Sequence, residues 1–256
     1  MKTVILCGGR GTRISEESQT RPKPMVEIGH RPILWHIMKL YAAYGQREFV
    51  LALGYKADLI KDYFLHYHAR QSDLTLDLAS GRAECRNPSA EDWKVHLVDT
   101  GENTLTGGRL LRLEPQLRQE GTFLLTYGDG VADIDLARLI DFHRRHGKLV
   151  TVTAVRPSAR FGGLQIQAGR VTQFREKPKS GEGWINGGFF VMEPAIFGYL
   201  KNDQTILEQE PLETLAKNGQ LMAYEHGGYW QCMDNLRDRV ALEEAWASGQ
   251  APWKKW

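Results

Sequence analysis

The chain contains few cysteines. Three occur among 256 residues, Cys7, Cys85 and Cys232, and they lie far apart in the sequence. An odd number at these spacings predicts neither a disulfide framework nor a C-x-x-C zinc site. Such a composition is typical of proteins in a reducing compartment, and we expect a cytoplasmic location.

Long hydrophobic runs are also missing. After the first three residues comes a run of only four apolar side chains, Val4–Cys7. This run is too short for the hydrophobic region of a secretory signal peptide. Because no segment approaches the roughly 18 apolar residues that suggest a membrane helix, we expect no membrane partner.

Neither sign of charge is in clear excess. Lys and Arg number 33 against 31 for Asp and Glu, which gives a net charge of +2. This balance does not favour a nucleic-acid partner, so any cationic function has to be local. The hydrophobic content of 42% predicts a folded chain. Since no internal repeat or Pro/Ser-rich linker interrupts it, we expect one domain over residues 1–256.

Short apolar runs alternate with amphipathic stretches over about the first 150 residues. Alternating strands and helices predict βαβ units, and hence a mostly parallel sheet flanked by helices. The fold class is therefore α/β and Rossmann-like. Strands are expected at 2–7, 48–54, 93–99 and 122–127, and helices at 31–45, 57–70 and 135–148.

Other segments are less regular. The alternation in "DLTLDL" (73–78) predicts a half-exposed strand, and the polar stretch 80–92 predicts a loop or a poorly formed insertion. After residue 150, short β-rich pieces separated by glycines predict hairpins laid against the main sheet. A single strand is expected at 184–192, and helices are expected at 206–218 and 235–247.

The stretch "VILCGGRGTR" (4–13) predicts a strand that ends in a glycine-rich, cationic loop. A Walker A loop is excluded because no Gly-Lys-Ser/Thr follows, and Ile14 stands where a Rossmann loop needs its third glycine. Backbone N–H groups in such a loop can approach phosphate oxygens, with Arg10 and Arg13 adding charge. Glycines that serve only to form a turn are the alternative.

A second cation follows in "RPKPMVEIG" (21–29), where Pro22 and Pro24 flank Lys23. Prolines on both sides restrict the backbone, and so they narrow the directions that the lysine side chain takes. This arrangement favours a lysine aimed at a phosphate.

The combined pattern G-G-x-G-T-R followed by P-K-P-M resembles the signature of the sugar-1-phosphate nucleotidyltransferases. Further motifs occur in the order and at the spacing of that family: "TYGDG" (126–130), "REKPK" (175–179), "WINGGFF" (184–190) and "WQCMD" (230–234). The resemblance implies a GT-A-like fold, with a β-rich sugar-binding region. It also implies attack by a sugar phosphate on the α-phosphorus of a nucleoside triphosphate.

The segment "DTGENTLTGGRL" (99–110) is similar to the members of this family that transfer a cytidylyl group. This likeness implies CTP and glucose-1-phosphate as the small-molecule substrates. It also divides the domain into a nucleotide-binding half, about 1–150, and a sugar-binding half, about 151–256.

Asp129 follows a predicted strand within a Gly-Asp-Gly turn, where parallel strands open toward a ligand. A carboxylate there can hold Mg²⁺, which takes one or two protein carboxylates. The resemblance implies that Asp234 is the second ligand. The alternatives are a turn aspartate for Asp129 and a helix N-cap for Asp234.

The remaining assignments come from the resemblance alone. Lys23 and Arg13 would be the catalytic cations on the phosphates. Lys177 would grip the sugar phosphate, Glu176 and Asn186 would bind hydroxyl groups of the sugar, and Gly187 would also belong to the sugar-phosphate site. A homo-oligomer is expected from the family and from the two tryptophans of the tail "APWKKW". The nucleotide would contact Leu6, Cys7, Gly8, Gly9, Arg10, Gly11, Thr12, Arg13, Lys23, Thr104, Arg109 and Gly128.

Three alternatives stay open. The same scaffold could take another base or another phosphorylated acceptor, because cytosine differs from other pyrimidines in only a few edge groups. A non-catalytic sugar-nucleotide sensor would be favoured if Lys23, Asp129 or Asp234 were missing, but all three are present. An NAD-dependent oxidoreductase is disfavoured by Ile14.

Overall fold

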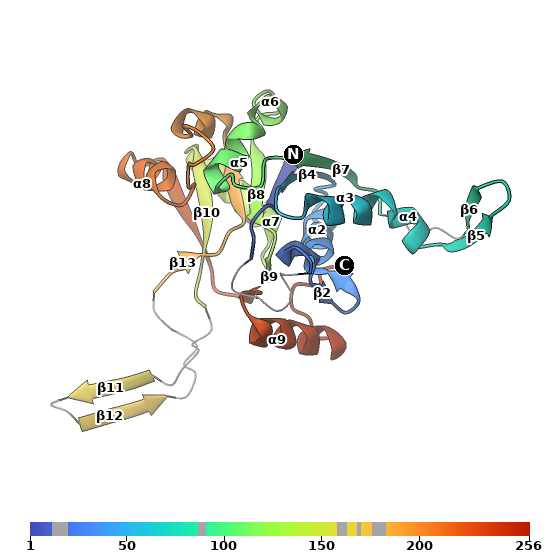
Figure 1. The fold of residues 1–256 in the computed structure, drawn as a ribbon. Helices are drawn as coiled ribbons and strands as arrows, with labels where there is room; N and C mark the ends of the chain where they lie inside the picture. Colours follow the sequence, from blue (N-terminus) through green and yellow to red (C-terminus); the bar gives the residue numbers. More distant parts are fainter. Residues whose placement is uncertain (12–19, 87–90, 158–162, 168–169, 176–182) are drawn as a thin grey trace.

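A computed structural model describes residues 1–11, 20–86, 91–157, 163–167, 170–175 and 183–256. Within these residues the central sheet has eight strands (Figure 1). Seven follow the order β13-β10-β14-β8-β1-β4-β7, and β15 pairs with β10. Their bounds are β13 Ile185–Asn186, β10 Val150–Val155, β14 Phe190–Met192, β8 Phe123–Tyr127, β1 Lys2–Leu6, β4 Glu48–Leu53, β7 Lys94–Asp99 and β15 Leu221–His226.

The sheet is mixed and mostly parallel, as the sequence predicted. Strand β1 pairs in parallel with β4 and β8, β4 with β7, and β10 with β15. Strands β13 and β14 are antiparallel to β10, and β14 is also antiparallel to β8. The continuous apolar runs of β1 and β4 reflect burial on both faces.

Helices cover both faces of the sheet. Ile5 packs into one core, whereas its neighbours Val4 and Leu6 pack into the other. Successive side chains of a strand point to opposite faces, and each buried aliphatic side chain contributes about 1.5–3 kcal/mol. The first core includes side chains from α2 (Ile33–Ala43), α3 (Ala57–Leu65), α7 (Leu136–His146) and α9 (Leu236–Ala247). The second includes side chains from α5 (Thr106–Arg112), α6 (Glu114–Leu117), η2 (Pro194–Tyr199) and α8 (Glu210–Lys217).

Short elements complete the fold. The expected helix at 57–70 is two helices, because α3 ends before His66 and α4 covers Tyr67–Arg70. The turn η1 covers Lys23–Met25, and β2 (Glu27–Ile28) pairs with β3 (Arg31–Pro32). A further pair joins β9 (Gly130–Ala132) to β16 (Trp230–Cys232). No helix in the described part of the chain is long and apolar enough to cross a membrane.

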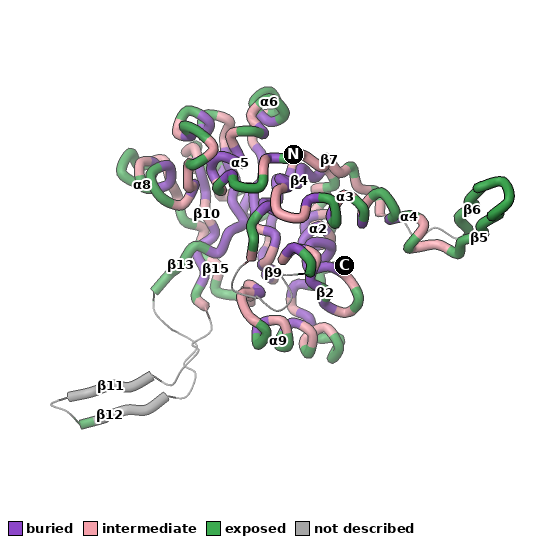
Figure 2. The backbone as a smooth tube through the Cα atoms, viewed as in Figure 1, coloured by how far each residue is buried: buried purple, intermediate pink, exposed green. Residues whose placement is uncertain are grey.

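The segment 73–86 differs from the prediction. Strand β5 (Asp73–Asp77) pairs with β6 (Arg82–Arg86), so a strand lies where we expected a loop. Every residue of both strands is exposed, and the hairpin projects from the body of the protein (Figure 2). The predicted strand is therefore confirmed as β5, but its expected half-burial was wrong, because no element among the described residues covers its leucine-bearing face.

The β-rich region after residue 150 also differs. Strand β10 belongs to the main sheet, whereas β11 (Gly163–Gln167) and β12 (Arg170–Arg175) pair with each other and with no main-sheet strand. Both edges of β10 are already occupied, by β15 on one side and by β13 and β14 on the other. The expected strand at 184–192 is interrupted by Gly188 and Phe189, whose φ angles are 75° and 48°.

The C-terminal tail folds back onto its own chain. Trp253 is 1% exposed, and Trp256 packs against Trp35 at a ring distance of 5.8 Å. Trp253 lies at a ring distance of 6.1 Å from His36, and both Trp35 and His36 belong to α2. The two tail tryptophans, which the sequence suggested as an oligomer contact, therefore pack against their own chain, and the tail gives no argument for an oligomer.

His36 makes the stability of this packing sensitive to acid. Its Nε2 lies 2.8 Å from the carbonyl oxygen of Ile28, and Trp253 donates to its Nδ1 at 3.4 Å. A second proton on the His36 ring would sit on Nδ1 and point at the indole N–H of Trp253. Burial lowers the pKa of His36 from 6.5 to about 4, even though the Ile28 carbonyl and Glu243 oppose this shift.

We expect the protein to lose stability as the pH falls from about 6.5 to about 4. Over this range the unfolded chain binds a proton at position 36 and the folded chain does not, a difference worth about 3 kcal/mol. Urea unfolding at pH 7.5 and pH 5 samples the upper part of this range and should show a loss of about 2 kcal/mol. His36→Gln keeps a donor and an acceptor without titrating and should lose less stability, whereas the exposed control His66→Gln should behave as wild type. An unchanged pH dependence in His36→Gln would contradict this assignment.

Candidate active site

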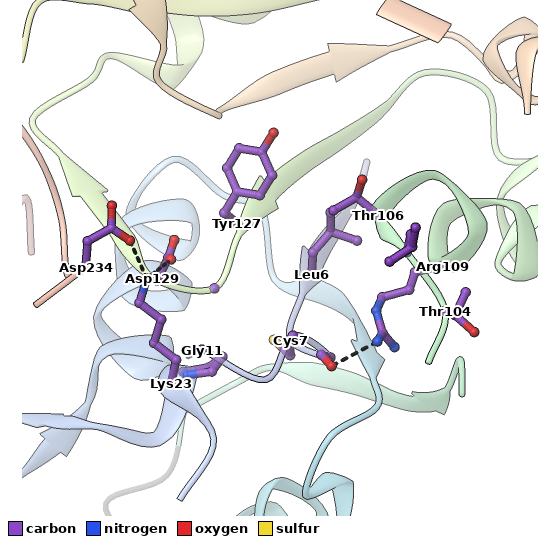
Figure 3. A pocket seen from close by; sticks show the side chains of 15 residues that line it. Leu6, Cys7, Gly11, Lys23, Thr104, Thr106, Arg109, Tyr127, Asp129 and Asp234 are labelled. Carbon is purple, nitrogen blue, oxygen red and sulfur yellow. Dashed lines mark hydrogen bonds and ion pairs between the residues drawn. The ribbon is translucent and has the colours of Figure 1, made fainter. Parts of the chain in front are cut away.

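A pocket of about 440 Å³ opens where β1 and β8 end (Figure 3). Its volume is within the range of small-molecule sites. The residues that line it come from distant parts of the chain: Leu6, Cys7, Gly8, Gly9, Gly11, Lys23, Pro24, Thr104, Leu105, Thr106, Arg109, Tyr127, Gly128, Asp129 and Asp234. The carboxyl ends of parallel strands are where ligands bind in open α/β sheets.

The glycines let segments of backbone approach each other closely. The Gly128 N–H donates to the Leu6 carbonyl at 3.2 Å, and a Cβ on Gly128 would lie 3.0 Å from that oxygen. Gly8 has no room for a side chain either, because its Cβ would overlap the Arg109 guanidinium. Space beside Gly9 is open. The bare loop that the sequence predicted therefore lines the pocket.

Lys23 lies between two carboxylates. Its Nζ is 2.5 Å from Asp129 Oδ2 and 2.7 Å from Asp234 Oδ1. Burial lowers the pKa of Lys23, but the two carboxylates outweigh burial and leave the pKa above its usual value. Pro22 and Pro24 flank the lysine in η1, as the sequence suggested. The ammonium is thus charged and held at the pocket wall.

The pairing of β9 with β16 brings Asp234 to Asp129. Cys232 lies opposite Gly130 in this register, and Met233 donates its N–H to the Asp129 carbonyl at 2.8 Å. Asp234 is not a helix N-cap, since Asn235 caps α9. The two aspartates, which are far apart in sequence, thus reach the same ammonium.

Arg109 is buried beneath the glycine loop. Its guanidinium donates to the carbonyl oxygens of Leu53, Gly101, Gly8 and Glu102 and to the hydroxyl of Thr100, at 2.7–3.2 Å. These acceptors follow or end β1, β4 and β7. Arg109 lines the pocket and also joins the three loops that surround it.

We expect Arg109→Lys to lower the free energy of unfolding by about 1–3 kcal/mol, because an ammonium cannot replace a planar fork of donors to buried carbonyls. Urea denaturation measures the change. Arg112→Lys is a matched control, since Arg112 lies one turn away and pairs with Asp203 at the surface. Its loss should stay below about 1 kcal/mol. Equal losses in the two variants would contradict the joining role of Arg109.

The predicted sugar-binding residues are only partly described. Asn186 donates from Nδ2 to the Tyr127 hydroxyl at 3.1 Å, and the Gly187 carbonyl accepts from the indole of Trp230 at 2.8 Å. Neither Asn186 nor Gly187 lines the pocket itself. The predictions for Thr12, Arg13, Glu176 and Lys177 lie outside the described residues.

Other predicted residues differ in their surroundings. Thr104 is buried and lines the pocket. Arg10 is exposed, pairs with Glu102 at 2.9 Å and does not line the pocket. Sequence reasoning missed Pro24, Leu105, Thr106 and Tyr127. Tyr127 precedes the Gly-Asp-Gly turn and could have been found from that position, whereas nothing in the sequence marked Thr106.

Comparisons with known proteins identify the family of the chain. The family model described as "Nucleotidyl transferase" matches residues 2–235. Two sequences named "Glucose-1-phosphate cytidylyltransferase", from Salmonella typhi and Salmonella typhimurium, are each 54% identical over 100% of both chains. The crystal structure of HddC from Yersinia pseudotuberculosis is similar, with a TM-score of 0.71 and 25% identity over 96% of this chain and 99% of that one. The chain therefore belongs to the nucleotidyl transferase family.

Proposed function

We propose that this enzyme transfers the cytidylyl group of CTP to glucose-1-phosphate, giving CDP-glucose and pyrophosphate. The observation that carries the chemistry is the convergence of Lys23, Asp129 and Asp234 in a pocket at the strand ends. The substrates are those in the printed name of the full-length relatives at 54% identity.

The reaction joins two polyanions. A phosphate oxygen of glucose-1-phosphate forms a bond to the α-phosphorus of CTP, and the bond from that phosphorus to the bridging oxygen of the β-phosphate breaks. Pyrophosphate leaves with the electron pair. A phosphate monoester has its second pKa near ~6, so the nucleophile is largely ionised at neutral pH and needs no general base. The protein has to align the reactants and stabilise negative charge.

Lys23 supplies a positioned positive charge for the α-phosphate. Its side chain is 12% exposed and lines the pocket, so solvent screens the charge weakly. Backbone N–H groups of the glycine loop can donate to phosphate oxygens without a side chain in the way. We assign the nucleotide to the segment Leu6–Arg13 with Lys23, Thr104, Arg109 and Gly128, and Arg13 also to catalysis.

Members of this family generally use Mg²⁺. The side chains of Asp129 and Asp234 fit this ion, because both carboxylates are partly exposed, face the pocket and already converge on one cation. Magnesium typically takes one or two protein carboxylates and completes its shell with water and phosphate oxygens. We propose that these aspartates hold Mg²⁺, which when bound would neutralise charge on the triphosphate.

The remaining assignments are also proposals. Residues of about 1–150 would bind the nucleotide, and those of about 151–256 the sugar, through Glu176, Lys177, Asn186 and Gly187. Asp234 is the exception, since it joins the metal pair. We also propose a homo-oligomer, and the exposed leucines of the β5–β6 hairpin, Leu74 and Leu76, are apolar surface that a second copy would cover.

The test is release of pyrophosphate with Mg²⁺ across a grid of substrates. CTP, UTP, dTTP, ATP and GTP are each combined with glucose-1-phosphate, other hexose-1-phosphates and non-sugar phosphates. The proposal predicts that CTP with glucose-1-phosphate dominates. A different dominant pair would overturn the substrates and leave the phosphate chemistry, whereas nucleotide binding without reaction would overturn the enzymatic function.

A further inference from the structure

Glu208 contacts two residues of the pocket without lining the pocket itself. The Tyr127 hydroxyl donates to Glu208 Oε1, and the Thr106 hydroxyl donates to Oε2, both at 2.6 Å. Tyr127 ends β8, and Thr106 begins α5. Each oxygen of one carboxylate therefore holds a pocket residue from a different element.

The carboxylate sets the direction of the hydrogen bonds beyond it. An ionised carboxylate only accepts, so both hydroxyl protons point toward Glu208. The Tyr127 oxygen then accepts from Asn186 Nδ2 at 3.1 Å, and the Thr106 oxygen accepts from the Leu207 N–H at 3.0 Å.

The two arms of this network lead to different parts of the site. Through Tyr127, one arm reaches Asn186, whose Oδ1 accepts from the Gly188 N–H at 2.9 Å. With both ends of its amide engaged, Asn186 has a defined orientation. Through Thr106, the other arm holds the start of α5, the helix that carries Arg109. One arm therefore serves the proposed sugar side and the other the nucleotide side.

We propose that Glu208 is a positioning residue for both substrates of the transfer reaction. Its carboxylate orients Tyr127 and Asn186 for the sugar phosphate and orients Thr106 for the nucleotide. This inference rests on the proposed function for the identity of the substrates. Glu208 touches no reacting atom, and its effect passes through the two hydroxyls that it binds.

The experiment cuts the arms separately and together. Tyr127→Phe removes the hydrogen bond on the sugar side, Thr106→Val removes the one on the nucleotide side, and Glu208→Ala removes the carboxylate that accepts both. Glu213→Ala, an exposed glutamate on α8, is the matched control. KM and kcat are measured for CTP and for glucose-1-phosphate with each variant. Losing a hydrogen bond to a charged group predicts a KM change of about tenfold or more.

We expect Tyr127→Phe to raise the KM for glucose-1-phosphate, Thr106→Val to raise the KM for CTP, and Glu208→Ala to raise both. Adding Tyr127→Phe to Glu208→Ala should change the KM for glucose-1-phosphate little further, because the arm is already cut. Fully multiplicative effects, or Glu208→Ala kinetics equal to those of Glu213→Ala, would overturn the proposal.

Two further comparisons keep the result decisive. If Glu208→Ala does not fold, the single-arm variants still test the proposal, and equal effects of both on both substrates would overturn it. The wild-type enzyme is assayed first on the substrate grid. If it prefers another pair of substrates, the proposed function fails. KM and kcat of the Glu208, Tyr127 and Thr106 variants are then measured with that pair.

Discussion

Asp129→Asn is expected to lower kcat by about 1,000-fold while the protein stays folded. Asparagine keeps the shape of the side chain but removes the charge that faces Lys23 and that we assign to Mg²⁺. The fold should survive because Asp129 contacts the residue that follows β16 through its backbone carbonyl, which accepts from the Met233 N–H. Turnover measured against Mg²⁺ concentration tests this expectation, and we expect a higher Mg²⁺ requirement in the variant.

The matched control is Asp141→Asn, which removes an exposed carboxylate from α7, outside the pocket. Its turnover and Mg²⁺ dependence should equal those of the wild type. Asp234→Asn should behave like Asp129→Asn, since both carboxylates contact the same ammonium. Near-normal turnover of Asp129→Asn with unchanged metal dependence would remove Asp129 from the site.

Lys23→Ala is expected to lower kcat by about 100- to 1,000-fold, since a positioned charge of this kind is commonly worth ~3 to 4 kcal/mol. The change should fall on kcat more than on KM, because the charge acts most strongly where negative charge develops. Lys217→Ala, at the exposed end of α8, is the control and should have wild-type kinetics. Weaker substrate binding with unchanged turnover would contradict the role of Lys23.

Local patterns predicted much of the architecture. Apolar runs such as 48–54 predicted buried strands because their side chains are covered on both faces. The location of Asp129 at the ligand-binding edge of the sheet was predicted because it follows such an apolar run in the sequence. Strand β5 was predicted, whereas β6 was missed because its polar residues suggest a loop and its pairing depends on the register of Leu74 with Cys85.

Long-range contacts account for most of what the sequence could not predict. Asp234 reaches Lys23 through the register of β16 on β9, and nothing near position 234 encodes that register. Arg109 looks like an ordinary cation of a helix until the fold places three strand ends around it. Glu208 carries no motif, and its importance depends on Thr106 and Tyr127 meeting beside it.

The most direct test of cytidylyl transfer follows the phosphate oxygens. Glucose-1-phosphate carrying ¹⁸O at its three non-bridging phosphate oxygens is reacted with unlabelled CTP. Mass spectrometry then measures the number of ¹⁸O atoms in each product. Attack of the sugar phosphate on the α-phosphorus predicts CDP-glucose with all three labels and pyrophosphate with none. Label in pyrophosphate, or CDP-glucose that has lost ¹⁸O, would contradict this mechanism.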